Sequence, residues 1–132
     1  MNNKFHQSKI YIIRSKKTDR VYIGATCNSL CRRMTGHRDK YHKWRICPLE
    51  KYYTSYELFN QNDEYIELLE AYKCNTQQEL NKREAYWIRL FGSLVVNKQI
   101  PGRTRSEYEA DRKRKILNLK ALQIEKTATL ND

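Results

Sequence analysis

The chain has 132 residues, of which 39% are hydrophobic, and a formal net charge of +11. This length suits one small domain with a real core, and the hydrophobic content argues against wholesale disorder. The sequence contains no apolar run of about 20 residues, which a membrane span needs, and it does not start with a secretory signal. We therefore expect an intracellular protein that is neither secreted nor membrane-spanning.

The positive charge is concentrated in the first third of the chain. Residues 1–51 contain 13 Lys and Arg against 3 Asp and Glu. A one-sided basic surface, in a chain with 10 tyrosines and 2 tryptophans, favours a polyanionic partner. Lys and Arg contacts to phosphates supply most of the non-specific affinity for nucleic acids. An anionic membrane surface or simple solubility is the alternative explanation of the charge.

The first predicted elements are a hairpin and a helix. Residues 9–13 are β-branched and aromatic, which is typical of a strand, and residues 21–24 form the expected antiparallel partner after a polar turn. Asn28 or Ser29 can cap a helix that runs to about Tyr41.

The elements that follow are less regular. Residues 48–58 could form a short helix that begins at its proline, and residues 65–69 are a plausible third strand. Residues 93–97 are expected to be extended. Residues 106–124 are rich in Arg, Lys, Glu and Leu, and this composition predicts an exposed or loosely docked helix.

A further helix is predicted over residues 76–91. Thr76 and Glu79 have the spacing of a capping box at its start, and Gly92 is well placed to end it.

Glu84 lies within the apolar face of this helix. Viewed along the helix axis, the side chain of Glu84 is about 40° from that of Leu80, the residue from which we measure the apolar stripe. Because an uncompensated buried carboxylate costs several kcal/mol, Glu84 there needs a cation or a metal ion. The alternative is a rotated helix in which Glu84 reaches solvent or pairs with Arg83 or Lys82.

The first helix carries two residues that could address a single ligand. Arg33 and His37 are four positions apart, with His37 inside the apolar stripe and Arg33 at its edge. Arg32 points away from this stripe. The alternatives are that His37 is an ordinary core histidine and that Arg33 packs its alkyl chain on the apolar stripe and extends its guanidinium into solvent.

The hairpin contributes Tyr11 and Tyr22, each flanked by aliphatic residues. Because side chains alternate along a strand, each tyrosine lies on the other face of the sheet from its two aliphatic neighbours. The sequence does not determine how the two strands are paired, so it leaves open whether both hydroxyls lie on the same face. Strand tyrosines are most often packing residues. Gly24 ends the second strand and indicates either a close backbone approach or a positive φ.

The four cysteines show no C-x-x-C pair, and we interpret them as reduced thiols with packing roles. A zinc site built from Cys27, Cys31, His37 and His42 is conceivable, but its spacing is not a standard one.

Five motifs in order resemble those of the GIY-YIG nuclease family. Lys9-Ile-Tyr11 resembles the "GIY" motif with Lys in place of Gly, and Val21-Tyr-Ile-Gly24 matches "YIG". Ser29 to His37 is similar to the family's helix, in which Arg is followed by three residues and His. Arg83-Glu-Ala-Tyr-Trp87 and Val96-Asn97 resemble the segment with the metal-binding Glu and the terminal strand with its Asn. The resemblance covers about residues 9 to 102.

The resemblance implies a metal-dependent DNA endonuclease that hydrolyses phosphodiester bonds. Tyr11 would be the general base or orient the attacking water, Arg33 would stabilise the charge that develops on the phosphate, and Glu84 would hold one Mg²⁺ or Mn²⁺ ion. The alternative is a nucleic-acid-binding protein on the same scaffold that has lost turnover. The resemblance implies auxiliary roles in the site for Tyr22, His37 and Asn97.

The fold implied is of the α/β class (α+β type), with a small central three-stranded antiparallel or mixed sheet flanked by helices. We expect a nuclease domain at residues 1–102 and a basic helical extension at residues 103–132. A stand-alone enzyme of phage, viral or mobile-element type is favoured because no specificity domain is evident, and the alternatives are a restriction enzyme and a junction or repair nuclease. The residues expected to contact DNA are Arg32, Arg38, Lys40, Arg103 and Arg105.

Overall fold

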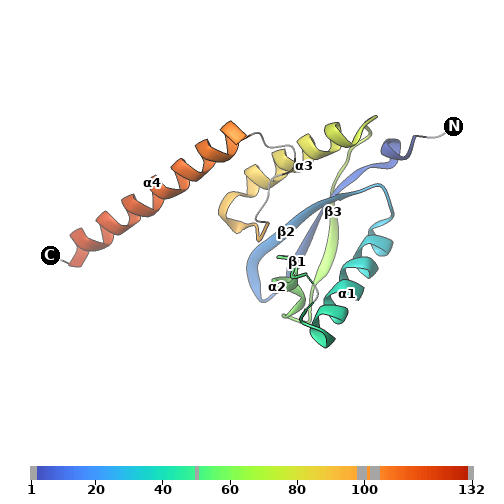
Figure 1. The fold of residues 1–132 in the computed structure, drawn as a ribbon, viewed down its shortest axis with the longest axis horizontal. Coiled ribbons are helices and arrows are strands. Elements are labelled where there is room, and N and C mark those ends of the chain that lie inside the picture. The colour runs from blue at the N-terminus through green and yellow to red at the C-terminus, as the bar shows by residue number, and fades with distance from the viewer. Residues whose placement is uncertain (1–2, 50, 98–100, 102–104, 131–132) are drawn as a thin grey trace. The chain divides into compact units, whose positions relative to one another are not determined.

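The computed structural model describes residues 3–49, 51–97, 101 and 105–130. The chain divides into two compact units, Met1–Gly102 and Arg103–Asp132. The first unit contains a three-stranded sheet with helices against it, and the described residues of the second form one long helix (Figure 1).

The sheet is antiparallel throughout, which is one of the two arrangements that the sequence left open. It contains β1 (Lys9–Ser15), β2 (Thr18–Thr26) and β3 (Tyr65–Ala71), in the order β2-β1-β3. All three strands were expected from their β-branched and aromatic residues, and the observed strands are longer than the predicted cores. The register places Tyr11 opposite Gly24 on the neighbouring strand.

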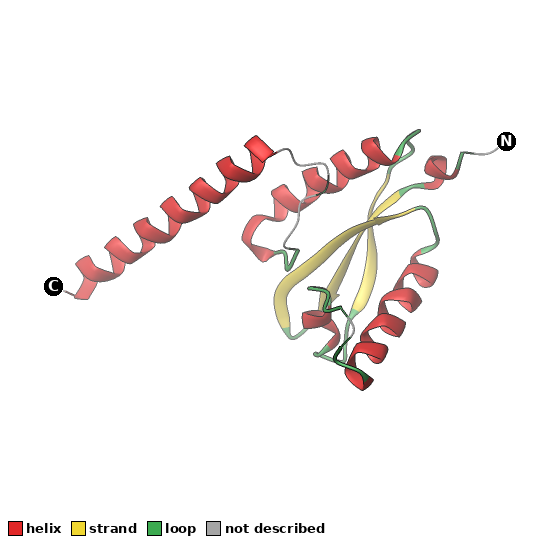
Figure 2. Cartoon of the chain, in the orientation of Figure 1, coloured by secondary structure: helices red, strands yellow, loops and turns green. Residues whose placement is uncertain are grey.

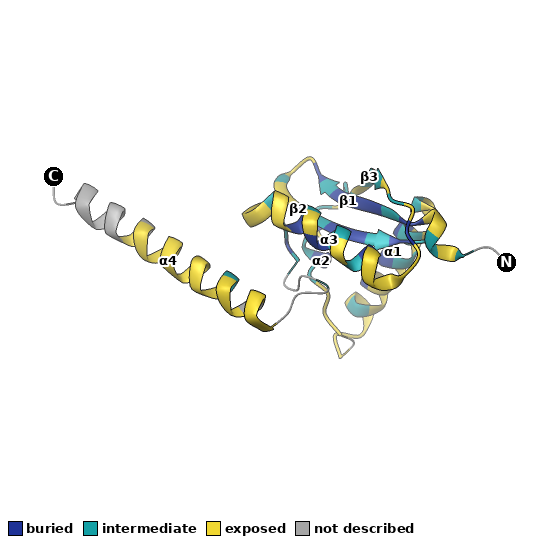
Figure 3. Cartoon of the chain, turned by 90° about the horizontal axis from the view of Figure 1, so that it is seen from above, coloured by how far each residue is buried: buried dark blue, intermediate teal, exposed yellow. Residues whose placement is uncertain are grey.

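The central strand β1 packs on both faces of the sheet. Its even-numbered residues Ile10 and Ile12 belong to a core cluster with Leu80 of α3 (Gln77–Phe91). Tyr11 and Ile13 belong to a second cluster that is completed by helices α1 (Leu30–Ile46) and α2 (Tyr56–Phe59). Helices thus lie against both faces of the sheet (Figure 2). This double burial explains why four consecutive residues of β1 have no exposed surface, and the strand is coloured as buried in Figure 3.

Helix α1 (Leu30–Ile46) begins at Ser29, whose hydroxyl accepts a hydrogen bond from the backbone N–H of Arg32 at 3.2 Å. Helix α3 begins at Thr76, which caps the backbone N–H of Glu79, and ends at Gly92 with φ of 60°. These caps confirm the predicted helix starts and the predicted stop.

The prediction of a helix over residues 48–58 is wrong. Helix α1 continues to Ile46, and Pro48 follows its end, a common place for a residue that cannot extend a helix. The short helix α2 spans only Tyr56–Phe59, and three of its four side chains are buried. Tertiary packing, more than a local start signal, fixes this turn.

The segment after α3 is only partly extended. Gly92–Leu94 forms a short 3-10 helix (η2), and a second one, η1, spans Lys4–Gln7. Val95 then pairs with Val21 in an isolated parallel bridge. The expected extended piece at residues 93–97 therefore starts later than predicted.

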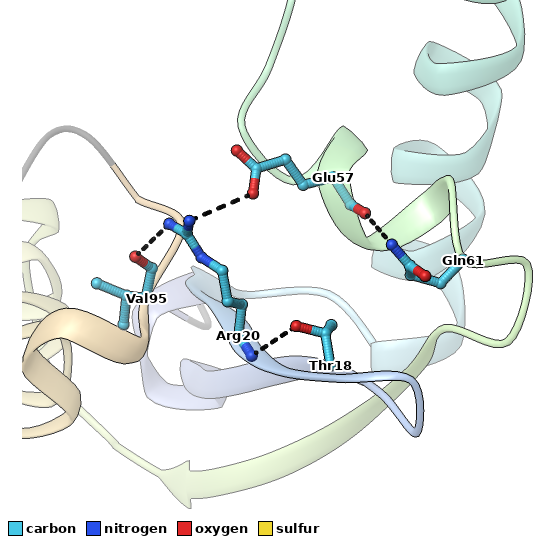
Figure 4. A network of polar contacts seen from close by, with 5 residues as sticks. All are labelled: Thr18, Arg20, Glu57, Gln61 and Val95. Atoms are coloured by element: carbon cyan, nitrogen blue, oxygen red, sulfur yellow. Dashed lines mark hydrogen bonds and ion pairs between the residues drawn. The ribbon is translucent and has the colours of Figure 1, made fainter.

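Arg20 of β2 connects this segment to α2. Its Nη2 donates a hydrogen bond to the carbonyl oxygen of Val95 at 3.3 Å, and its Nη1 lies 3.8 Å from Oε2 of Glu57 (Figure 4). The backbone carbonyl of Glu57 also accepts a hydrogen bond from Gln61 at 3.5 Å. Arg20 thus holds β2, α2 and the chain after α3 together.

The second unit contains α4 (Arg105–Leu130), which is longer than the expected helix over residues 106–124. Its described side chains are mostly exposed, and ion pairs along its surface join Arg105 to Glu109 and Arg114 to Asp111. That residues 1–102 and 103–132 are separate domains stays a prediction. No helix among the described residues is long and apolar enough to cross a bilayer.

Candidate active site

Tyr11 is the centre of a hydrogen-bonded group between β1 and α1. Its side chain has no exposed surface, and its hydroxyl oxygen lies 2.8 Å from Nε2 of His37 and 3.0 Å from Nε of Arg33. A Cβ on Gly24 would overlap with this hydroxyl. Gly24 is therefore required by the close approach of the Tyr11 ring, and a positive φ plays no part.

The spacing of Arg33 and His37 in α1 places both side chains against Tyr11. Burial, with the positive charges of Arg33 and Lys40, lowers the pKa of His37 to about 3. The imidazole is thus neutral at pH 7, and a neutral ring has one nitrogen that accepts. The Arg33 Nε–H donates to the phenol oxygen of Tyr11, and in the tautomer whose Nε2 carries no proton His37 accepts from the same hydroxyl.

The same surroundings keep the phenol protonated. Burial and, second, the charge of Tyr22 raise the pKa of Tyr11 above its ordinary value, although Arg33 acts in the opposite direction. A proton can leave this hydroxyl only when an acceptor takes it or when more positive charge arrives.

Tyr22 lies on the same face of the sheet as Tyr11, which settles the register that the sequence left open. Its ring centroid is 6.4 Å from that of Tyr11 and 5.4 Å from that of His37. The side chain is half-buried, and burial followed by the charge of Glu84 raises its pKa.

Glu84 lies between Leu80 and Ile88 on α3, one helical turn from each, and these two neighbours are buried. Burial raises the pKa of Glu84 to about 7, and the positive charge of Arg33 opposes this effect. The carboxylate in turn raises the pKa values of Tyr11 and Arg33, although it is not the first cause of either shift. Glu84 therefore lies within electrostatic range of the Tyr11 and Arg33 pair.

Arg83 does not neutralise Glu84. Its guanidinium forms two hydrogen bonds with Glu70 of β3, at 2.5 and 2.7 Å, and its ring contacts include Tyr86 at 4.4 Å. The alternative in which Glu84 pairs with Arg83 is thus not the arrangement in the structure.

Asn97 contacts the backbone of β2. Its Oδ1 accepts a hydrogen bond from the N–H of Ile23 at 3.1 Å, and its Nδ2 donates to the carbonyl oxygen of Ile23 at 2.7 Å. Ile23 is adjacent to Gly24, so Asn97 fixes the strand beside the Tyr11 hydroxyl.

A comparison with protein families matches residues 7–99 to the GIY-YIG catalytic domain. The chain belongs to the GIY-YIG family. This is a nuclease family, whose members generally use a divalent metal ion. Neither the search of curated proteins nor the search of solved structures returned a match.

One position departs from the GIY-YIG motif. Lys9 stands where the first motif has Gly, and its ammonium group donates hydrogen bonds to the carbonyl oxygens of Gln7 and Asn28, at 3.0 and 3.1 Å. The substitution therefore joins the start of β1 to the turn before α1 and leaves Tyr11 in place.

The donor set fits a single divalent ion held by water and substrate in addition to protein. Among the described residues, no group of three or more His, Cys, Asp or Glu side chains could hold a metal. Glu84 is instead a lone half-buried carboxylate, and Mg²⁺ often uses one or two carboxylates together with waters and phosphates. The zinc alternative has no support, because Cys27, Cys31, His37 and His42 all lie in the described part of the chain and do not form such a group, and Nε2 of His37 is hydrogen-bonded to Tyr11.

The residues expected to contact DNA lie in different surroundings. Arg32 is exposed, Arg38 pairs with Glu64 at 3.4 Å, and the Lys40 ammonium lies 5.1 Å from the ring centroid of Tyr53. Arg103 lies outside the described residues, and Arg105 belongs to α4 of the second unit.

The sequence analysis missed Phe59, whose ring stacks on His37 with centroids 6.1 Å apart. It also missed the Glu70 partner of Arg83. A signal was present for Phe59, because aromatic residues at positions 52, 53, 56 and 59 recur at helical spacing. No local sequence pattern predicts that Glu70, in a strand, pairs with Arg83, which lies in a helix 13 residues later.

Proposed function

We propose that this protein is a metal-dependent DNA endonuclease with Tyr11 as the general base and Glu84 as the protein ligand of one Mg²⁺ or Mn²⁺ ion. The observation that carries the proposal is the hydrogen-bonded set of Tyr11, Arg33 and His37 beside a carboxylate with a raised pKa. Side chains with strongly perturbed pKa values in one place indicate a functional site.

In the proposed reaction, the oxygen of a water molecule bonds to the phosphorus atom while the bond from phosphorus to the leaving sugar oxygen breaks, and that oxygen takes a proton from solvent. The proton of the attacking water passes to the phenol oxygen of Tyr11. The phenolic proton moves at the same time to Nε2 of His37, 2.8 Å away. Burial, Arg33 and Lys40 keep the pKa of free His37 low, and phosphate groups beside the two cations would raise it. The substrate thus makes His37 a better proton acceptor.

Arg33 has two roles in this proposal. Its Nε–H holds the phenol oxygen of Tyr11 at 3.0 Å, and its Nη groups would donate to a non-bridging oxygen of the phosphate. A guanidinium suits this second role, because it stays charged and stabilises the negative charge of the transition state.

Glu84 would bind the metal ion, which supplies positive charge to the phosphate and to the leaving oxygen. Deprotonation of Glu84 becomes favourable when a cation is near, and this accounts for a carboxylate inside an apolar helix face. Asn97 keeps β2 in position, and the half-buried Tyr22 next to Tyr11 would hydrogen-bond the nucleophile or the phosphate.

The phosphodiester must approach from the side of Tyr22, Arg33 and Glu84. These three residues are half-buried, whereas Tyr11 has no exposed surface. DNA is the proposed polyanion, since the first 51 residues carry most of the net positive charge. The phage, viral or mobile-element type and the intracellular location stay predictions from the sequence.

The test is nicking of a supercoiled plasmid with Mg²⁺ or Mn²⁺, by the natural protein and by Glu84→Gln. The matched control is Glu67→Gln, which removes an exposed carboxylate of β3 that pairs with Arg14. We expect nicking by the natural protein and the control, and none above background by Glu84→Gln. Salt-sensitive DNA binding without any nicking would favour the alternative of a binding protein without turnover.

A further inference from the structure

An exposed aromatic side chain between two lysines lies close to the site. The Tyr53 residue is 39% exposed, and the ammonium groups of Lys40 and Lys51 each lie 5.1 Å from its ring centroid. Together these three residues form what we call the Tyr53 rim. Lysine contacts with an exposed ring are weak, so both ammonium groups are available to a phosphate.

The Tyr53 ring is supported from behind. Its centroid lies 5.8 Å from that of Tyr56, which is only 2% exposed and meets it edge-on. Tyr56 in turn contacts Trp44, Tyr41 and Tyr52 at centroid distances of 5.3 to 5.5 Å. An aromatic ring braced in this way has little freedom to lose when a ligand stacks on it.

Ring contacts and charges both connect the Tyr53 rim to the active site. Tyr56, which supports Tyr53, contacts Tyr41, and Tyr41 stacks on the Phe59 ring that also stacks on His37. The positive charge of Lys40, three residues after His37 in α1, contributes to the low pKa of His37, after burial and Arg33. Tyr53 contributes in a small way to the raised pKa of Tyr22, which burial chiefly causes. The rim is thus close to the two residues that border Tyr11.

A nucleotide has the chemistry that this rim can recognise. A flat aromatic base stacks on a tyrosine ring, and the phosphates on either side attract ammonium groups. We propose that Tyr53 stacks with an unpaired base of the DNA strand next to the scissile phosphodiester, while Lys40 and Lys51 bind the adjoining phosphates. This inference rests on the proposed function for the position of the cut.

The proposal has a consequence for the substrate. Both faces of a base inside a duplex are covered by its neighbours, so a base that stacks on Tyr53 must come from a single strand, a fork or a flipped-out position. The protein would therefore prefer DNA with an unpaired nucleotide beside the cut over continuous duplex.

The test measures the contribution of the base separately from that of the phosphates. The Kd of the full chain is measured in EDTA for a short single-stranded oligothymidylate and for an abasic strand of the same length and charge. Three variants are compared with the natural protein: Tyr53→Leu, Tyr53→Phe and the control Tyr65→Leu, which removes an exposed tyrosine of β3.

We expect the natural protein, Tyr53→Phe and Tyr65→Leu to bind the thymidylate strand about fivefold to a hundredfold more tightly than the abasic strand. Tyr53→Leu should bind both strands equally. A purely structural role of Tyr53 would weaken binding to both strands by the same factor. That result, or equal binding of both strands by the natural protein, would overturn the proposal.

This experiment is independent of cleavage. Base-dependent binding that Tyr53→Leu abolishes, in a protein that never nicks DNA, would support the stacking role and contradict the proposed nuclease. Nicking by a protein that does not distinguish thymidylate from abasic strands would leave the nuclease proposal intact and refute the stacking role.

Discussion

Replacing Glu84 by Gln tests the central feature of the site through stability as well as activity. Burial raises the pKa of Glu84 from the ordinary 4.5 to about 7. Each pH unit of such a difference corresponds to about 1.4 kcal/mol, so the ionised carboxylate lowers the free energy of unfolding by up to about 3 kcal/mol. Glutamine has nearly the same shape and carries no charge.

The direction in which pH changes the free energy of unfolding follows from proton binding. Between pH 4.5 and about 7 the folded state holds a proton on Glu84 that the unfolded state has released. The free energy of unfolding of the natural protein should therefore fall, relative to that of Glu84→Gln, as the pH rises through this window. Above about pH 7 the full difference is present, and Glu84→Gln is the more stable protein.

The assay is urea unfolding followed by tryptophan fluorescence at several pH values. Trp44 and Trp87 both belong to the first unit, so the signal reports on the unit that contains Glu84. Millimolar Mg²⁺ should stabilise the natural protein above about pH 7 and should leave Glu84→Gln unchanged, because ligands that bind the folded state stabilise it.

The control is again Glu67→Gln, whose wild-type carboxylate is about half exposed. It should follow the natural protein at every pH and respond to Mg²⁺ in the same way. Parallel stability curves for the natural protein and Glu84→Gln, with no effect of Mg²⁺ on either, would mean that the Glu84 carboxylate is well hydrated and that its proposed metal role is wrong.

Three further outcomes are expected. Tyr11→Phe removes the hydroxyl between Arg33 and His37, and single-turnover cleavage should slow by about 10² to 10⁴-fold; a rate close to that of the natural protein would exclude Tyr11 as the base. Gly24→Ala forces a methyl group onto the Tyr11 hydroxyl and should lower the free energy of unfolding by about 1 to 3 kcal/mol, measured in urea; unchanged stability would contradict the close contact. Cleavage at limiting Mg²⁺ should rise with pH through about 7 as Glu84 loses its proton, and more Mg²⁺ should move the midpoint to lower pH; a midpoint that ignores Mg²⁺ would assign this titration to another group.

Local signals in the sequence predicted much of the fold. The caps at Ser29 and Thr76 and the stop at Gly92 were recognisable because each depends on a few neighbouring residues. The same holds for the strands. The prediction of a helix over residues 48–58 was wrong because α2 exists only where its side chains pack against the core, and the aromatic spacing in this region does not encode where the helix begins and ends.

The residues of the candidate site could be proposed from the sequence, whereas much of its geometry could not. The family motifs pointed to Tyr11, Arg33 and Glu84, and helical spacing placed Arg33 and His37 on one face. Whether Tyr11 and Tyr22 share a face depended on the strand register, which one sequence does not encode locally. The position of Tyr53 beside the site depends on how an irregular loop folds back over α1, so only the structure could reveal it.

The chain between Val95 and Asn97 also sets a lower limit on the length of a foldable fragment. The N–H of Val96 bonds to the carbonyl oxygen of Val21 at 2.8 Å, and the Asn97 amide occupies both polar groups of Ile23. The Asn97 side chain thus makes hydrogen bonds to the outer edge of β2 that a neighbouring strand would otherwise make. A fragment that ended at Gly92 would expose this border to solvent, where bare strand edges invite self-association.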